Sequence, residues 1–135
     1  MDMESRDEQK KRGLKRFFNS FKYSFDGLRY AYKYEQSLTI HFVVAFFVVV
    51  AGLWLKINLT EWLLCLLLMG VVMATELINT SLEAVIDLVC PEIHPLAKIA
   101  KDTASAAVFV FSTVAFFSGL IIFIPKIINV IKTFM

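Results

Sequence analysis

Three long apolar runs, separated by short polar segments, set the pattern of this chain. Leu38 to Leu55 carries one titratable side chain, His41, and Thr103 to Ile124 carries no charge. The remaining run begins near Trp62. A helix that rises about 1.5 Å per residue needs about 20 residues to cross a bilayer core of roughly 30 Å. The pattern therefore predicts an all-α integral membrane protein with three transmembrane helices, at about residues 36–56, 62–89 and 97–124.

Residues 14–34 have a different pattern, that of an amphipathic helix. At about 100° per residue, one face is apolar and largely aromatic, and the opposite face is charged. The apolar face holds Phe17, Phe21, Phe25, Leu28 and Tyr32, and the charged face holds Lys22, Asp26, Arg29 and Lys33. Such a face is typical of an interfacial helix in the headgroup layer, and a soluble helix packed on a core is the alternative. Residues 1–13 are polar and of mixed charge, which predicts a disordered cytoplasmic tail.

Composition and charge agree with a membrane location. The 135 residues are 58% hydrophobic, and the mean hydropathy is +0.66. Nine of the fourteen Lys and Arg residues lie before Tyr34. Because cytoplasmic segments of membrane proteins are rich in Lys and Arg, this asymmetry predicts a cytoplasmic amino terminus and, after three spans, a carboxyl terminus outside. Residues 14–135 are expected to form a single membrane domain.

The second predicted span carries polar side chains at helical spacing. Five of them fall within about 100° of arc, and we call them the polar stripe. They are Glu76, Asn79, Thr80, Glu83 and Asp87. A carboxylate deep in a span costs about 2.5–3.5 kcal/mol, so several together indicate a metal, a partner or water. The alternative, acids that reach the surface from a helix end, suits Asp87 better than the deeper Glu76.

Other polar residues are expected at the same membrane boundary. Glu35 continues the aromatic face of the amino-terminal helix, where a carboxylate needs a cation. Glu35 and Glu83, with waters and phosphate oxygens, could hold Mg²⁺. Lys101 and Asp102 could add a phosphate-binding cation and a polar partner, although an ordinary charged helix start would also explain them. The sequence has no glycine-rich phosphate loop, so any nucleotide site would differ from that of soluble kinases.

Two strings of residues, in this order and spacing, carry a family resemblance. Residues 76–87 read Glu-Leu-Ile-Asn-Thr-Ser-Leu-Glu-Ala-Val-Ile-Asp, and residues 94–102 read His-Pro-Leu-Ala-Lys-Ile-Ala-Lys-Asp. With Arg16 and Glu35, these strings resemble the prokaryotic diacylglycerol kinase family. His41 makes the chain more similar to the undecaprenol kinase branch of that family. One departure is Gln36-Ser37, which stands where that branch usually has Arg-Asn.

The resemblance implies a homotrimer in a bacterial cell membrane, with active sites shared between subunits. It implies transfer of the γ-phosphoryl group of ATP to the hydroxyl of a membrane lipid alcohol, undecaprenol or alternatively diacylglycerol. On matching positions, Glu76 would be the general base and Asn79 would help to orient it. Glu35 and Glu83 would hold Mg²⁺. The residues that would bind or support the nucleotide and its metal are Arg16, Tyr23, Glu35, Glu83, Asp87, His94, Lys101 and Asp102.

Two non-enzymatic functions compete with this interpretation. A cation-conducting oligomer could use Glu76 and Glu83 as a polar path, but a conduction path needs polarity across the whole bilayer. Acids are absent from His41–Leu55 and from Thr103–Ile124. A membrane-anchored scaffold would explain the basic aromatic helix and leave the acids within the span unexplained. We therefore expect ATP, a lipid and the bilayer as partners, and no nucleic acid.

Overall fold

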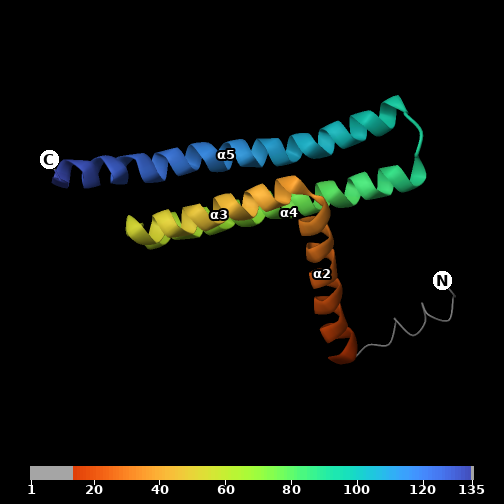
Figure 1. Ribbon diagram of the computed structural model, residues 1–135, viewed down its shortest axis with the longest axis horizontal. Coiled ribbons are helices and arrows are strands. Elements are labelled where there is room, and N and C mark those ends of the chain that lie inside the picture. The colour runs from red at the N-terminus through yellow and green to blue at the C-terminus, as the bar shows by residue number, and fades with distance from the viewer. Residues whose placement is uncertain (1–13, 135) are drawn as a thin grey trace. The chain divides into compact units, whose positions relative to one another are not determined.

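The computed structural model describes residues 14–134, and within this range every regular element is a helix (Figure 1). The helices are α2 (Leu14–Tyr34), α3 (Gln36–Trp54), α4 (Leu59–Val89) and α5 (Pro95–Phe134). This confirms the predicted all-α class. The predicted disordered tail, residues 1–13, lies outside the described residues.

Helix α2 belongs to a separate compact unit, residues 1–34, and residues 35–135 form the second unit. The helix is amphipathic as predicted. Its aromatic side chains are exposed, and the rings of Phe17 and Phe21 meet edge to face with centroids 5.1 Å apart. Such an exposed aromatic face suits a helix that lies in the headgroup layer, which stays a prediction.

Three helices of the second unit are long and apolar enough to cross a membrane, namely α3, α4 and α5. At about 1.5 Å per residue, α3 is about 28 Å long, α4 about 46 Å and α5 about 60 Å. Helix α4 packs against both α3 and α5. Helices α3 and α4 run antiparallel, and the chain returns along α5 (Figure 1). The expected break between α4 and α5 is confirmed, since α4 ends at Val89 and α5 begins at Pro95.

Helix α4 begins at Leu59, earlier than the predicted start near Trp62. The reason is a capping box. Glu61 N–H donates to Asn58 Oδ1 at 3.0 Å, and Asn58 N–H donates to Glu61 Oε2 at 2.7 Å. Both groups satisfy amides that a helix start leaves unpaired. Thr60 and Glu61 therefore lie in the first turn of α4, and Asn58 caps it.

Helix α5 continues past Pro125 as far as Phe134, whereas the apolar run of the sequence ends at Ile124. Proline removes one backbone hydrogen bond from a helix, but transmembrane helices tolerate this because packing against neighbours compensates. Two contacts hold the helix here. Ile122 is buried with Ile57 and Cys65, and Lys126 Nζ lies 2.9 Å from Glu61 Oε2.

Candidate active site

Burial of the polar stripe falls along α4 towards the loop of residues 90–94. Glu76, Asn79 and Thr80 are buried, with exposed fractions of 4%, 8% and 8%. Glu83 is half-buried and Asp87 is exposed. Asp87 therefore has the position expected of an acid at a helix end. Glu76 does not, because a carboxylate so buried needs a hydrogen-bond donor, a metal or a ligand.

Glu76 obtains a donor from the neighbouring helix. The Ser37 hydroxyl, in the first turn of α3, donates a hydrogen bond to Glu76 Oε1. Ser37 is half-buried. The sequence did not single out Ser37 as a site residue. Ser37 lies two positions after Glu35, in the Gln36-Ser37 pair that differs from the Arg-Asn usual in the undecaprenol kinase branch. The contact joins α3 and α4 at the depth of the most buried acid.

Asn79 faces Glu83 rather than Glu76. Its Nδ2 donates to Glu83 Oε1 at 3.0 Å, while its Oδ1 is buried and has no hydrogen-bond partner. The predicted contact by which Asn79 orients Glu76 is therefore not among the hydrogen bonds of the described residues. An amide oxygen without a partner beside a carboxylate offers two oxygens to a hard cation or to a donor from a ligand.

Lys101 joins α5 to the loop end of the polar stripe. Its Nζ lies 2.5 Å from Asp87 Oδ1, and both side chains are partly exposed. Asp102, the next residue, pairs with Lys98 one turn earlier in α5. Adjacent residues on a helix point about 100° apart, so Lys101 and Asp102 face different neighbours.

The other predicted residues lie at element starts or in the separate unit. Glu35 is the residue before α3, with extended backbone and no side-chain capping bond. His94 precedes α5, and its Nδ1 accepts a hydrogen bond from the Leu96 amide at 3.2 Å. Arg16 and Tyr23 are exposed on α2. Thus the structure brings together Glu76 with Ser37, Asn79 with Glu83, and Asp87 with Lys101.

The carboxylates do not form a metal cage by themselves. No group of three or more His, Cys, Asp or Glu side chains within residues 14–134 is placed to hold a metal ion. This is compatible with Mg²⁺, which usually takes one or two carboxylates and completes its shell with water and substrate phosphates. The oxygens of Glu83 and Asn79 are of the type that this ion prefers.

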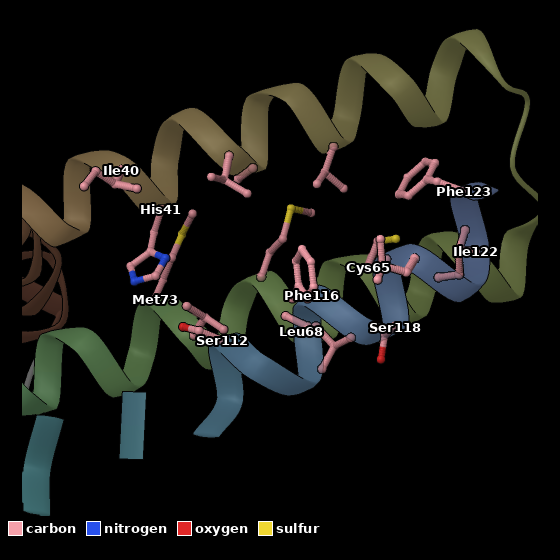
Figure 2. Close-up of a pocket in the computed structure, with 18 of the residues that line it drawn as sticks. Ile40, His41, Cys65, Leu68, Met73, Ser112, Phe116, Ser118, Ile122 and Phe123 are labelled. Atoms are coloured by element: carbon pink, nitrogen blue, oxygen red, sulfur yellow. The ribbon is translucent and has the colours of Figure 1, made fainter. Parts of the chain in front are cut away.

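A cavity of about 490 Å³ lies between α3, α4 and α5, beyond the polar stripe. Figure 2 shows His41, Met73 and Ser112 at one end of it, and Ile122 and Phe123 at the other. Its lining is almost wholly apolar and includes no acid or Lys or Arg side chain. The polar stripe therefore does not continue along this cavity, which argues against the cation-conducting alternative.

These features define a class of protein: a small helical membrane protein with a buried carboxylate in one long apolar helix and further polar and charged side chains towards the end of that helix. Comparison with known sequences identifies the family. A sequence model described as prokaryotic diacylglycerol kinase matches residues 22–123. The chain belongs to this family and is a membrane lipid kinase.

Individual relatives cover most of the chain. An undecaprenol kinase from Bacillus subtilis (strain 168) is 37% identical over 125 residues, which span 93% of this chain and 100% of the relative. A diacylglycerol kinase from Helicobacter pylori (strain ATCC 700392 / 26695) is 41% identical over 98 residues, 73% of this chain and 77% of the relative. The diacylglycerol kinase of Escherichia coli (strain K12) is 34% identical over 103 residues, 76% of this chain and 84% of the relative.

Proposed function

We propose that this protein transfers the γ-phosphoryl group of ATP to undecaprenol and forms undecaprenyl phosphate. The observation that carries the reaction is Glu76, a carboxylate buried to 4% exposure in a helix long and apolar enough to cross a membrane. The choice of lipid is supported by the similarity to an undecaprenol kinase along 93% of the chain. Diacylglycerol is the second candidate substrate, because the diacylglycerol kinase of Helicobacter pylori is 41% identical to this chain over a shorter length, 98 residues.

In the proposed reaction, Glu76 acts as the general base. The lipid hydroxyl oxygen attacks the γ-phosphorus while Glu76 accepts the hydroxyl proton. The bond between the γ-phosphorus and the bridging oxygen breaks, and ADP leaves with the electron pair. Phosphoryl transfer depends mainly on positioning the reactants and on neutralising phosphate charge. The general base contributes by accepting the proton of the attacking hydroxyl.

The remaining groups are proposed to hold the nucleotide and its metal. Glu83 and Glu35 would bind Mg²⁺, which neutralises phosphate charge when bound, and the unpartnered Asn79 Oδ1 beside Glu83 supports a ligand there. Lys101, held by Asp87, supplies a cation for phosphate oxygens. The further residues proposed to support the nucleotide are Arg16, Tyr23, His94 and Asp102.

We also propose a homotrimer in a bacterial cell membrane, with a cytoplasmic amino terminus and a carboxyl terminus outside. The family resemblance supports the trimer and its shared sites. The charge asymmetry of the sequence supports the orientation, because nine of the fourteen Lys and Arg residues precede Tyr34. Large exposed apolar side chains on α3, such as Phe46, Phe47 and Val50, are suited to contact lipid or another subunit.

The test is an assay of the full chain, purified in detergent micelles, with γ-labelled ATP and Mg²⁺. Undecaprenol and diacylglycerol are added separately at equal mole fraction in the micelle. The proposal expects label in undecaprenol at the higher rate, and none when Mg²⁺ is chelated. A higher rate with diacylglycerol would select the second candidate. Label in neither lipid would contradict the kinase reaction itself.

A further inference from the structure

We infer that Ser37 is a positioning residue for the general base: its hydroxyl fixes one oxygen of the Glu76 carboxylate so that the other oxygen receives the lipid proton. The inference rests on the proposed role of Glu76. It concerns a residue on a different helix, outside the acids that define the polar stripe. The contact that carries it is the hydrogen bond from Ser37 Oγ to Glu76 Oε1.

The direction of this hydrogen bond follows from chemistry. An ionised carboxylate only accepts hydrogen bonds, and a serine hydroxyl has one hydrogen to donate. Ser37 therefore donates to the form of Glu76 that acts as a base. A hydrogen bond to a charged group is shorter and stronger than one between neutral groups, so it can hold a side chain with three rotatable bonds in one orientation.

Neighbouring polar groups on α4 do not orient this carboxylate. The hydroxyl of Thr80 donates to the backbone carbonyl of Glu76 at 3.0 Å, and the amide of Asn79 donates to Glu83. The hydrogen bond that reaches the Glu76 carboxylate comes from Ser37, on the neighbouring helix α3. The proposal assigns the second carboxylate oxygen, Oε2, to the proton of the lipid hydroxyl.

The position of Ser37 in α3 adds to its effect. Ser37 lies in the first turn, next to the amides that a helix start leaves unpaired, and Glu35 makes no side-chain cap there. Ser37 therefore ties the Glu76 carboxylate to the start of α3, so the alignment of α3 with α4 helps to fix the position of the carboxylate.

The experiment compares turnover of three variants with wild type, using the labelled-ATP assay with the lipid that wild type prefers. Ser37→Ala removes the donor, Ser37→Cys keeps the shape with a weak donor, and Ser37→Thr keeps the hydroxyl. Because misplacing a catalytic group by about 1 Å can lower a rate by about 100-fold, we expect kcat to fall about 10- to 100-fold in the Ala and Cys variants. The Thr variant should stay within about threefold of wild type, an order-of-magnitude expectation from its retained donor. Rates are expressed per ATP-binding site, so partial misfolding of a variant does not lower them.

A purely structural role for Ser37 would give a different result. It would lower the number of ATP-binding sites and leave kcat per site unchanged. Positioning instead lowers kcat and leaves the KM for ATP within about twofold, because the base does not bind the nucleotide. Thr113→Val is the matched control, since the Thr113 hydroxyl donates to the carbonyl of Phe109 in its own helix. It should keep the wild-type rate.

The outcomes separate this inference from the proposed function. Ser37→Ala and Ser37→Cys with kcat within twofold of wild type, or Ser37→Thr as slow as Ser37→Ala, would overturn the positioning role while the kinase reaction stands. If the wild-type chain labels no lipid, the proposed function fails first. If Glu76→Gln turns over as wild type does, Glu76 is not the base and the role of Ser37 fails with it.

Discussion

Gly52 lies near the turn between α3 and α4 and sets how these two helices are aligned along their length. The contact of Ser37 with Glu76 depends on this alignment. Gly52 of α3 is buried against Trp62 of α4, at the turn that joins the two helices. Fifteen residues separate Gly52 from Ser37 along α3, and fourteen separate Trp62 from Glu76 along α4. Both stretches are about 21–23 Å long in a helix, so the close approach at Gly52 places Ser37 level with Glu76.

Replacing Gly52 with alanine should therefore destabilise the helix pair. A Cβ atom at Gly52 would lie 2.8 Å from Trp62 Cη2 and 3.0 Å from Ile57 Cδ1. Carbon atoms in contact prefer about 3.5–4.0 Å, so the indole ring would have to move by about 0.7–1 Å. Such overpacking costs about 1–3 kcal/mol. Ile57 is buried, which leaves the ring little room to move.

Gly70→Ala is the matched control for Gly52→Ala. A Cβ atom at Gly70 meets nothing within 4 Å. Both changes bring the same gain in helix propensity, up to about 1 kcal/mol, so their difference isolates the steric contact. The free energy of unfolding is measured in mixed micelles with rising sodium dodecyl sulfate, followed by circular dichroism. We expect Gly52→Ala to be less stable than Gly70→Ala by about 1–3 kcal/mol. Equal stability of the two variants would refute the close packing of Gly52 on Trp62.

Three further changes test other parts of the structure. Asn58→Ala removes the cap of α4 and should lower the free energy of unfolding by about 0.5–2 kcal/mol in the same micelle titration; an unchanged value would contradict the capping box. Lys101→Met should raise the KM for ATP at least about tenfold, because charge-assisted bonds to phosphate are strong. The control Lys126→Met, near the turn between α3 and α4, should leave this KM unchanged. An equal rise in KM in both variants would exclude a phosphate contact of Lys101. Glu83→Gln should raise the Mg²⁺ concentration for half-maximal rate about 10-fold or more, and an unshifted Mg²⁺ titration would remove Glu83 from the metal site.

The spacing of apolar and polar residues was sufficient to predict the helices and the depth of the acids. Helical periodicity predicted that Glu76 and Asn79 share one face of α4, because the face on which a side chain lies depends only on spacing within the helix. Both side chains are buried. The start of α4 was misplaced because polar residues before Trp62 were interpreted as a loop. Asn58 and Glu61, spaced by three, are in fact the signature of a capping box.

Contacts between helices could not be predicted from periodicity. The bond from Ser37 to Glu76 depends on the register of α3 against α4, which packing at the turn decides. The pairing of Lys101 with Asp87 depends likewise on how α5 lies against α4. The continuation of α5 past Pro125 also depends on neighbouring helices, because a proline removes one backbone hydrogen bond and packing can compensate for that loss.

In the proposed reaction the buried carboxylate of Glu76 takes the proton from the lipid, and a comparison of two glutamate variants measures the contribution of that carboxylate. Glu76→Gln and Glu92→Gln each replace one carboxylate, and Glu92 lies exposed in the loop between α4 and α5. Single-turnover transfer of label from ATP to the lipid is measured with ATP binding as the control for folding. We expect Glu76→Gln to bind ATP and to lose about 10²–10⁴-fold in rate, while Glu92→Gln reacts as wild type does. Transfer by Glu76→Gln at the wild-type rate would contradict the proposed role of Glu76.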